Sequence, residues 1–223
     1  MYVAFGALVV WIVVASVRAG RQMRADLEAF AGGFPWQRGP LPRMPPADST
    51  GGARVSGTLR GPNGAPEHVI VRFINGYRGA PSTTSVGLLV GDGPTQKYNY
   101  PWITIIPAQE FPRTFAWQVG DGVRTGQPEF DARYRMHVYV SFGALGGPTM
   151  LSGTYPLAQE LMRLLLAGRR PLSVSYDGKF AYVSWRGHEV RNEDVQEALA
   201  VLRLFVPMIP GLHTTIRGSD RRA

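Results

Sequence analysis

The chain begins with an uninterrupted apolar segment. Residues 1–17 contain no charged side chain, and arginines follow at Arg18, Arg21 and Arg24. About 17 to 25 helical residues cross a hydrocarbon core of about 30 Å, so this segment with its flank is long enough for one membrane-spanning helix. Basic flanks stay on the cytoplasmic side. The pattern therefore predicts a single-pass protein of the inner (plasma) membrane, with its N-terminus outside and its remaining residues cytoplasmic.

A cleaved signal peptide is the alternative interpretation of this segment. It requires positive residues before the apolar stretch and a small-residue cleavage site after it. Here no lysine or arginine precedes the stretch, and Val17-Arg18-Ala19 is a poor cleavage site. A buried amphipathic helix also fits badly, because the segment is apolar on every face. Small residues let a second helix approach such an anchor closely, and the candidate contacts with a partner helix are Phe5, Gly6, Val9, Trp11 and Ile12.

Composition favours a place beside an anionic surface and excludes several kinds of chemistry. The formal net charge is +8, from 24 lysines and arginines and 16 carboxylates. A basic residue near an anionic leaflet contributes about 1 kcal/mol, so Arg18, Arg21 and Arg24 are candidate contacts with anionic phospholipid. The absence of cysteine excludes disulfides, thiol catalysis and zinc–thiolate sites. No dense basic run interleaves with aromatics, so we expect no nucleic-acid partner.

Glycine and proline divide the rest of the chain. We expect the membrane helix to continue beyond the bilayer to residue 31 and to end at Gly32-Gly33. Residues 32–52 are rich in proline and glycine, which predicts a stiff, extended linker over Phe34–Pro46. Residues 53–210 are expected to form one cytoplasmic domain, and the basic residues 211–223 a flexible tail.

Alternation of apolar and polar residues predicts strands in the first part of this domain. They are expected at residues 54–60, 69–74, 102–106, 114–119 and 132–142, with a short strand at 86–90 inside a long loop over 75–99. The strand at 132–142 has the strongest pattern, with Tyr134 and Met136 on one face and Arg135 and His137 on the other. Such alternation is typical of a half-buried antiparallel sheet.

The last third predicts a helix, a hairpin and a second helix. Pro156 is expected to begin the first helix, and Gly168 to end it. Asp177-Gly178 predicts a tight turn between two strands. Asn192 is expected to cap the second helix, and Pro207 to stop it. Strands followed by helices indicate an α+β domain with an antiparallel sheet and with helices on one face.

The sequence contains no motif for a metal centre or a nucleotide site. The histidines are His68, His137, His188 and His213, and none has the spacing of a metal-binding motif. A hydrogen-bonded structural role is expected for His137. Residues 91–97 superficially resemble a phosphate-binding loop, but they lack the glycine before Lys97 and the Ser or Thr after it. We therefore predict no cofactor and no metal.

Two groups of charged residues have both a structural and a functional interpretation. Glu129 and Asp131 form a possible acid–base pair, but a start of a strand with Asp131 paired to Arg133 or Arg135 is preferred. Arg124, Arg133 and Arg135 form a candidate face for phosphate or an acidic partner, because guanidinium groups bind phosphate through two parallel hydrogen bonds. A solvated sheet face is the alternative. The structural interpretation is preferred for both groups, so no catalytic residue is predicted.

Three segments, residues 127–134, 155–166 and 173–185, resemble a group of uncharacterised actinobacterial proteins with one membrane helix. The resemblance covers the anchor and roughly residues 100–206, and it lies in pattern and composition. Within that group the chain is most similar to mycobacterial lipid uptake coordinator subunits, which are accessory proteins of Mce lipid importers. The resemblance implies a helix packed against an integral membrane permease and a cytoplasmic domain near its ATPase.

These observations lead to a ranked set of functions. We expect a non-enzymatic, membrane-anchored accessory or regulatory subunit of a larger complex, and the resemblance implies an ABC-type envelope lipid transporter. The alternative is a stand-alone peripheral module that binds anionic lipid or phosphate at the inner leaflet. A hydrolase is the third possibility, which would require a deep polar pocket with perturbed titratable groups.

Overall fold

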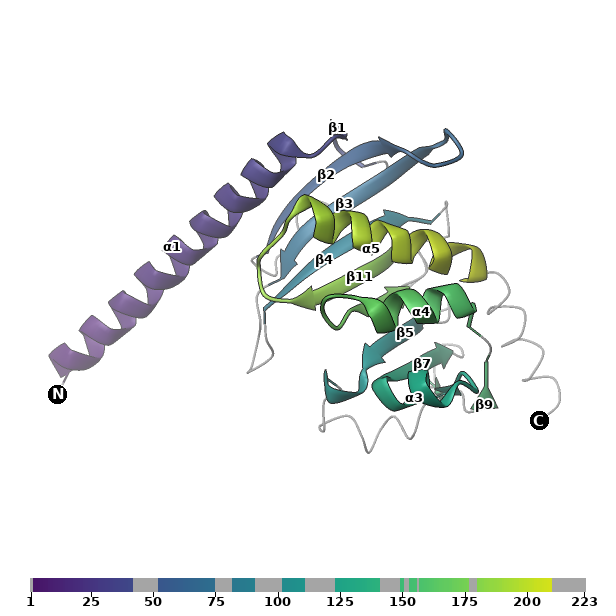
Figure 1. Ribbon diagram of the computed structural model, residues 1–223. Coiled ribbons are helices and arrows are strands. Elements are labelled where there is room, and N and C mark those ends of the chain that lie inside the picture. Colours follow the sequence, from purple (N-terminus) through teal and green to yellow (C-terminus); the bar gives the residue numbers. More distant parts are fainter. Residues whose placement is uncertain are drawn as a thin grey trace. The chain divides into compact units, whose positions relative to one another are not determined.

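The computed structural model describes residues 2–41, 52–74, 82–90, 102–110, 123–140, 149–150, 153–155, 157–176 and 180–209. Figure 1 shows the helices and strands of the chain. The chain forms two compact units. The first contains Met1–Ser85 and Arg186–Asp194, and the second contains Val86–Trp185 and Val195–Ala223. Residues 53–210, which we expected to form one domain, therefore contribute to both units.

Several expected features lie outside the described residues. They are the strand at 114–119, Pro156, the Asp177-Gly178 turn, most of the 75–99 loop and the tail at 211–223.

The first unit begins with α1 (Tyr2–Gly33), a single helix of 32 residues. It continues past Arg18 without a break and ends at Gly32-Gly33, as expected. Met23, Leu27 and Ala31 are buried. Because residues four apart lie on one helical face, they form the stripe by which α1 packs on β2 (Ala53–Arg60). Among the residues that the structure describes, no helix combines the length and the apolar character needed to cross a membrane.

Three strands complete the described sheet of the first unit. β2 pairs in antiparallel fashion with β1 (Gln37–Arg38) and with β3 (Pro66–Ile74). Every second residue of β2 is buried from Ala53 onwards, which confirms the expected alternation. A turn at Gly61–Gly64 joins β2 to β3. Gly64 donates its N–H to the carbonyl of Gly61 and has a φ of +81°, a conformation that glycine adopts without strain.

The expected extended linker is packed against the first unit over residues 34–41. Phe34 and Leu41 are buried, and Trp36 donates its indole N–H to the carbonyl of Ala31 across 3.1 Å. The ring centroids of Phe34 and Trp36 lie 5.3 Å apart in an edge-to-face arrangement. Burial of these aromatic rings against the end of α1 stabilises the turn more than solvation of an extended chain would. A stiff spacer was therefore the wrong expectation for this described part.

The sheet of the second unit is largely antiparallel, as expected. Its strand order is β11, β10, β5, β7, β6, β9, with β8 paired to β7, and only the described pair β6 and β9 is parallel. The bounds are β5 (Trp102–Pro107), β6 (Val123–Arg124), β7 (Tyr134–Val140), β8 (Thr149–Met150), β9 (Gly153–Thr154), β10 (Ser173–Tyr176) and β11 (Phe180–Arg186). β4 (Thr83–Leu89) crosses the boundary between the units, and it is longer than the short strand expected at 86–90.

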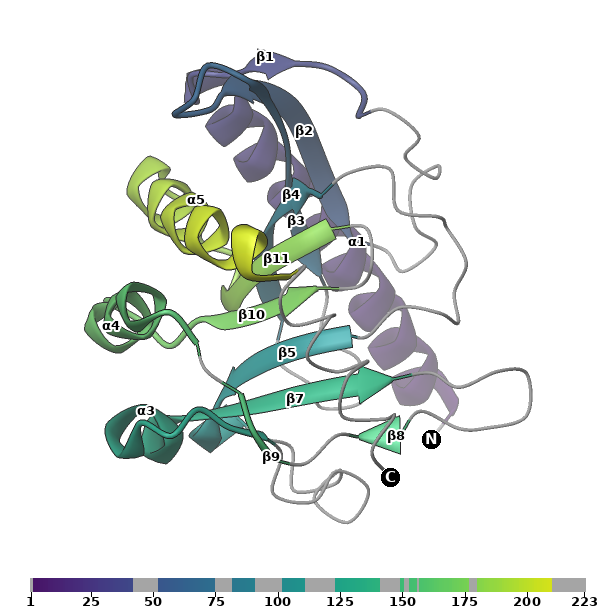
Figure 2. The same ribbon diagram turned by 90° about the vertical axis from the view of Figure 1, so that its right-hand side faces the viewer.

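Two longer helices cover one face of this sheet. Figure 2 shows α4 (Gln159–Ala167) and α5 (Asn192–Phe205) on the same side of β10 and β11, with α3 (Pro128–Arg133) beside the start of β7. Short 3-10 turns follow β5 (Ala108–Glu110, η1) and α5 (Val206–Met208, η3). The α+β class and the antiparallel sheet are confirmed.

The strong strand starts later than its sequence pattern predicted. Residues 128–133 form α3, and β7 begins only at Tyr134. Pro128 at the first helical turn, acidic Glu129 and Asp131 near the N-terminus and Arg133 in the last turn are all favourable helix signals. These signals outweigh the alternation of apolar and polar side chains. The strand that we expected from residue 132 therefore begins two residues later.

Candidate functional site

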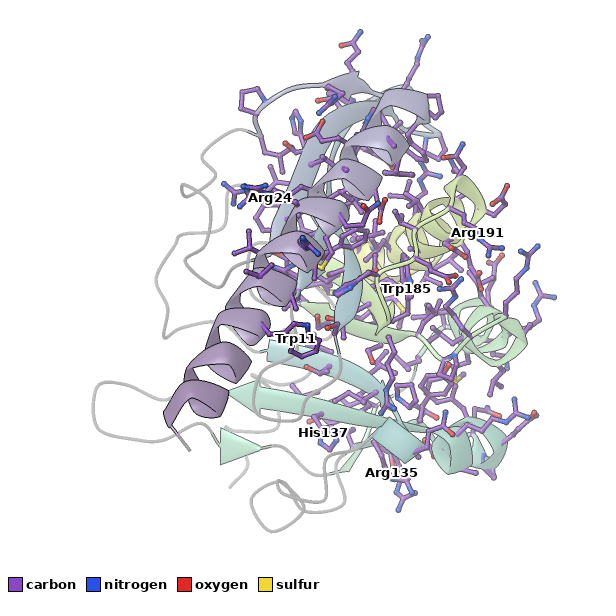
Figure 3. The ribbon with its side chains drawn as sticks, turned by 90° about the vertical axis from the view of Figure 1, so that its left-hand side faces the viewer. Trp11, Arg24, Arg135, His137, Trp185 and Arg191 are labelled. Atoms are coloured by element: carbon purple, nitrogen blue, oxygen red, sulfur yellow. The ribbon has the colours of Figure 1, made fainter. Side chains whose placement is uncertain are left out.

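The exposed apolar side chains of α1 form the first candidate site. The relative exposure is 68% for Trp11, 42% for Val14 and 49% for Val17, and these are the exposed large hydrophobic residues in the described part of the chain. Figure 3 shows Trp11 and Arg24 on this helix. Large apolar side chains that gather on one exposed surface are typical of a site that contacts a partner or a membrane.

The three arginines that follow continue the same helical stripe. Arg18, Arg21 and Arg24 are all exposed. At about 100° per residue, they and the three apolar residues fall within an arc of about 140°. The centre of this arc is about 130° from the face with Leu27 that packs on β2. We call these six residues, Trp11, Val14, Val17, Arg18, Arg21 and Arg24, the α1 stripe.

The α1 stripe includes only some of the residues expected at the membrane. Arg18, Arg21 and Arg24, which were expected to contact anionic lipid, are exposed on α1. Trp11, expected to contact a partner helix, is exposed. The other candidate helix contacts have side chains outside the described residues; they are Phe5, Gly6, Val9 and Ile12.

The opposite end of α1 is fixed to the first unit by a cluster around Trp36. Its indole ring lies 6.0 Å from the ring of Phe30, between ring centroids. A Cβ atom on Gly57 would lie only 2.7 Å from Cδ2 of Trp36, so this close approach requires glycine. Arg38 also forms an ion pair with Glu28, although an exposed pair of this kind contributes little to stability.

The arginines expected to share a face in the second unit have separate environments. Arg124 is exposed on β6. Arg133 lies at the end of α3, where its Nη1 donates to the carbonyl of Leu166 across 3.4 Å. Arg135 lies on β7 and donates to the main-chain carbonyls of Asp131 and Tyr134. Because α3 extends to Arg133 and β7 begins at Tyr134, Arg133 and Arg135 do not lie on one strand.

The Asp131 carboxylate has a structural role different from the expected one. Its oxygens accept hydrogen bonds from the N–H and hydroxyl groups of Thr125, each at 2.9 Å, and from the N–H of Gly126 at 3.2 Å. These bonds fix the turn before α3, where Gly126 has a φ of +81°. The carboxylate therefore bonds to this turn. The expected pairing of the Asp131 side chain with Arg133 or Arg135 was wrong.

His137 is buried in the second unit, with a relative exposure of 1%. It lies opposite Thr104 on the neighbouring strand β5. Burial, together with the positive charge of Arg135, lowers the pKa of His137 below its usual value of 6.5. The imidazole is therefore neutral at pH 7 in the folded chain.

This lowered pKa predicts that stability decreases as the pH falls below about 6.5. In that range the unfolded chain binds a proton at His137 that the folded chain does not bind. Each pH unit over which the states differ by one proton lowers the free energy of unfolding by about 1.4 kcal/mol. Urea unfolding of the wild type and of His137→Gln between pH 7.5 and 5.5 measures this effect. Equal pH slopes for the two proteins would contradict it.

The described side chains do not form a metal centre. No group of three or more His, Asp or Glu residues in this part of the chain is placed to hold a metal ion. The residues missed by sequence reasoning are Arg169 and Arg170, which follow α4 and line the same cavity as Arg133. Their signal was the pair of arginines directly after the helix-ending Gly168. Comparison of the chain with protein-family models, with curated proteins and with solved structures finds no match.

Proposed function

We propose that the protein is a non-enzymatic accessory or regulatory subunit of a larger membrane complex, anchored by the apolar start of α1. The exposure of Trp11, Val14 and Val17 is the observation that supports this function most. Removing apolar surface from water is favourable by about 25 cal/mol per Å². A lipid or protein environment around this end of the helix would provide that stabilisation, while the other end of α1 stays packed on β2.

The basic half of the α1 stripe supports an orientation for this anchor. Arg18, Arg21 and Arg24 follow the apolar residues directly and are exposed. Basic residues remain on the cytoplasmic side and are attracted to its anionic phospholipids. In the proposed arrangement the N-terminus is outside the inner membrane, the arginines lie at the inner leaflet, and the residues that follow them are cytoplasmic.

The resemblance to lipid uptake coordinator subunits supports a partner for the anchor. We assign the partner as an integral membrane permease, together with its ATPase, of an ABC-type envelope lipid transporter of the Mce kind. The contacts proposed with the permease are Phe5, Gly6, Val9, Trp11 and Ile12. Small residues such as Gly6 permit the close helix approach that association in lipid requires.

A pull-down from native membranes in mild detergent tests this function. We expect the tagged full-length chain to recover permease and ATPase subunits in fixed proportion. The triple variant Trp11→Ser, Val14→Ser, Val17→Ser should lose them, because it removes the exposed apolar surface. Ala25→Ser, also at an exposed position of α1, is the matched control and should recover the same subunits as the wild type.

Two outcomes of this experiment would contradict the accessory function. One is recovery of the chain alone in several detergents, and the other is unchanged recovery of partners by the triple variant. The exposed arginines of the α1 stripe favour a second candidate, a stand-alone module that binds anionic lipid. Recovery of the chain alone would favour that candidate if the chain also bound phosphatidylglycerol vesicles in a salt-sensitive manner.

A further inference from the structure

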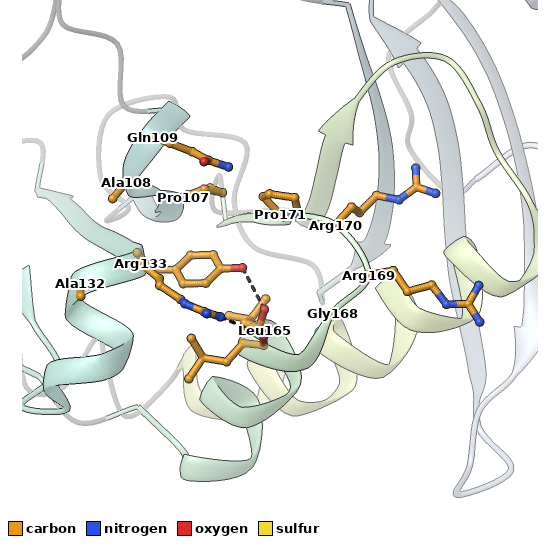
Figure 4. Close-up of a pocket in the computed structure, with 12 residues that line it drawn as sticks. Pro107, Ala108, Gln109, Ala132, Arg133, Leu165, Gly168, Arg169, Arg170 and Pro171 are labelled. Atoms are coloured by element: carbon orange, nitrogen blue, oxygen red, sulfur yellow. Dashed lines mark hydrogen bonds between the residues drawn. The ribbon is translucent and has the colours of Figure 1, made fainter.

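A cavity of about 390 Å³ in the second unit lies where β5 and η1, the junction of α3 with β7, and the segment after α4 meet. Figure 4 shows this cavity, which we call the arginine pocket because Arg133, Arg169 and Arg170 line it. Its volume lies within the range of about 300 to 1,000 Å³ that is usual for small-molecule sites. The pocket has no role in the proposed function, and of its lining residues only Arg133 was expected from the sequence to bind phosphate.

The residues that line the arginine pocket carry only positive charge. None of those described as lining it is Asp or Glu. Arg133 and Arg169 are exposed, and the guanidinium of Arg170 lies 5.3 Å from the ring centroid of Trp185. Glu197 lies close to the pocket, since its Oε1 would lie 2.9 Å from a Cβ atom on Gly168. The charged side chains among the described lining residues are the three arginines.

The end of α4 at the pocket does not oppose an anion. Carbonyl groups at a helix C-terminus carry partial negative charge. Here the carbonyl of Leu165 accepts a hydrogen bond of 2.9 Å from the hydroxyl of Tyr134, and that of Leu166 accepts one from Arg133. These donors reduce the local negative charge. A guanidinium group has five N–H donors, so Arg133 retains donors that can bind a ligand.

We propose that the arginine pocket binds a phosphate group. Figure 4 shows that Arg133 extends along the pocket towards Leu165, whereas the side chains of Arg169 and Arg170 point away from Arg133. An exposed arginine changes rotamer within nanoseconds, so Arg169 closes on a bound phosphate from the rim. Two negative charges on a phosphate monoester match this set of guanidinium groups better than the single charge of a carboxylate does. Gln109, also a lining residue, adds an amide donor.

Calorimetric titration of the detergent-solubilised full-length chain tests this site at constant ionic strength. One arm uses inorganic phosphate, and the other uses short-chain phosphatidic acid below its micelle concentration. We expect saturable binding, weakened about tenfold by Arg169→Gln, since hydrogen bonds to ionised groups are the strong ones. Arg133→Gln should weaken it similarly. Arg163→Gln, an exposed arginine of α4 outside the pocket, is the matched control and should leave the affinity unchanged.

The two arms distinguish the sources of the phosphate. Arg169-dependent binding of inorganic phosphate supports a site for the free group, and such binding of phosphatidic acid alone supports a lipid headgroup. The absence of saturable binding in both arms would overturn the proposal. So would equal weakening by Arg163→Gln and Arg169→Gln, which would indicate general attraction to positive charge. Because the pocket lies in the second unit, this result is independent of the pull-down through α1.

Discussion

Replacing Gly57 with alanine is expected to lower the free energy of unfolding by about 2 to 3 kcal/mol. The new Cβ would lie 2.7 Å from Cδ2 of Trp36 and 2.8 Å from the carbonyl oxygen of Gln37. The second of these atoms belongs to the backbone of β1, so a change of the Trp36 rotamer alone cannot relieve the overlap. Both β1 and the tryptophan must move away from β2. Urea denaturation followed by far-UV circular dichroism measures the effect.

Gly39→Ala is the matched control for Gly57→Ala. No atom lies within 4 Å of a Cβ placed on Gly39, so the same chemical change should be neutral or slightly stabilising there. Adding Trp36→Ala to Gly57→Ala should recover part of the lost stability, because the two residues are in contact. Similar unfolding free energies for Gly57→Ala and Gly39→Ala would show that the tryptophan does not pack on β2 in this way.

The second large effect is expected from Leu27→Asp, which places a carboxylate on the packed face of α1. Leu27 has a relative exposure of 1%. An uncompensated charge in such a position costs about 3 to 5 kcal/mol, so α1 should separate from β2. Amide hydrogen exchange should then become faster in both elements. Limited trypsin digestion should also cleave more readily at Arg21 and Arg24.

Ala25→Asp adds the same charge to an exposed position of α1 and is the control for Leu27→Asp. It should leave exchange in β2 at the wild-type rate. If both variants changed exchange equally, the effect would come from charge on the helix rather than from its contact with the sheet. If neither variant changed it, the packed face of α1 would not contribute to the stability of the first unit.

The sequence predicted most clearly those features that depend on neighbouring residues. Gly32-Gly33 marked the end of α1, and alternation in residues 54–60 marked β2. The strands on either side of Asp177-Gly178 pair in antiparallel fashion, as that turn signal implied. Each of these signals acts over a few residues, where intrinsic backbone preferences and the period of burial dominate.

Features that depend on distant contacts were missed. The prolines around Phe34 and Trp36 indicated an extended segment rather than a packed one. The packing of Trp36 also needs a glycine on another element, at position 57. The arginine pocket joins Arg133 to Arg169 only because α4 ends beside α3. A local sequence pattern predicts neither the packing of Trp36 on Gly57 nor the pocket that Arg133 and Arg169 share. Periodicity also failed at residues 128–133, where helix-start signals and strand alternation coincide in the same residues.

The unbroken course of α1 has a mechanical consequence for the proposed anchor. From Arg18 to Gly33 the helix rises about 23 Å, at about 1.5 Å per residue. Between these ends, Met23, Leu27 and Ala31 are buried and pack it on β2. The helix is continuous between Arg18 and Gly33. A tilt of about 10° at the membrane, small against the usual spread of helix tilts, would displace the far end by about 4 Å. Through this unbroken helix, a movement of a membrane partner would be transmitted to the rest of the first unit.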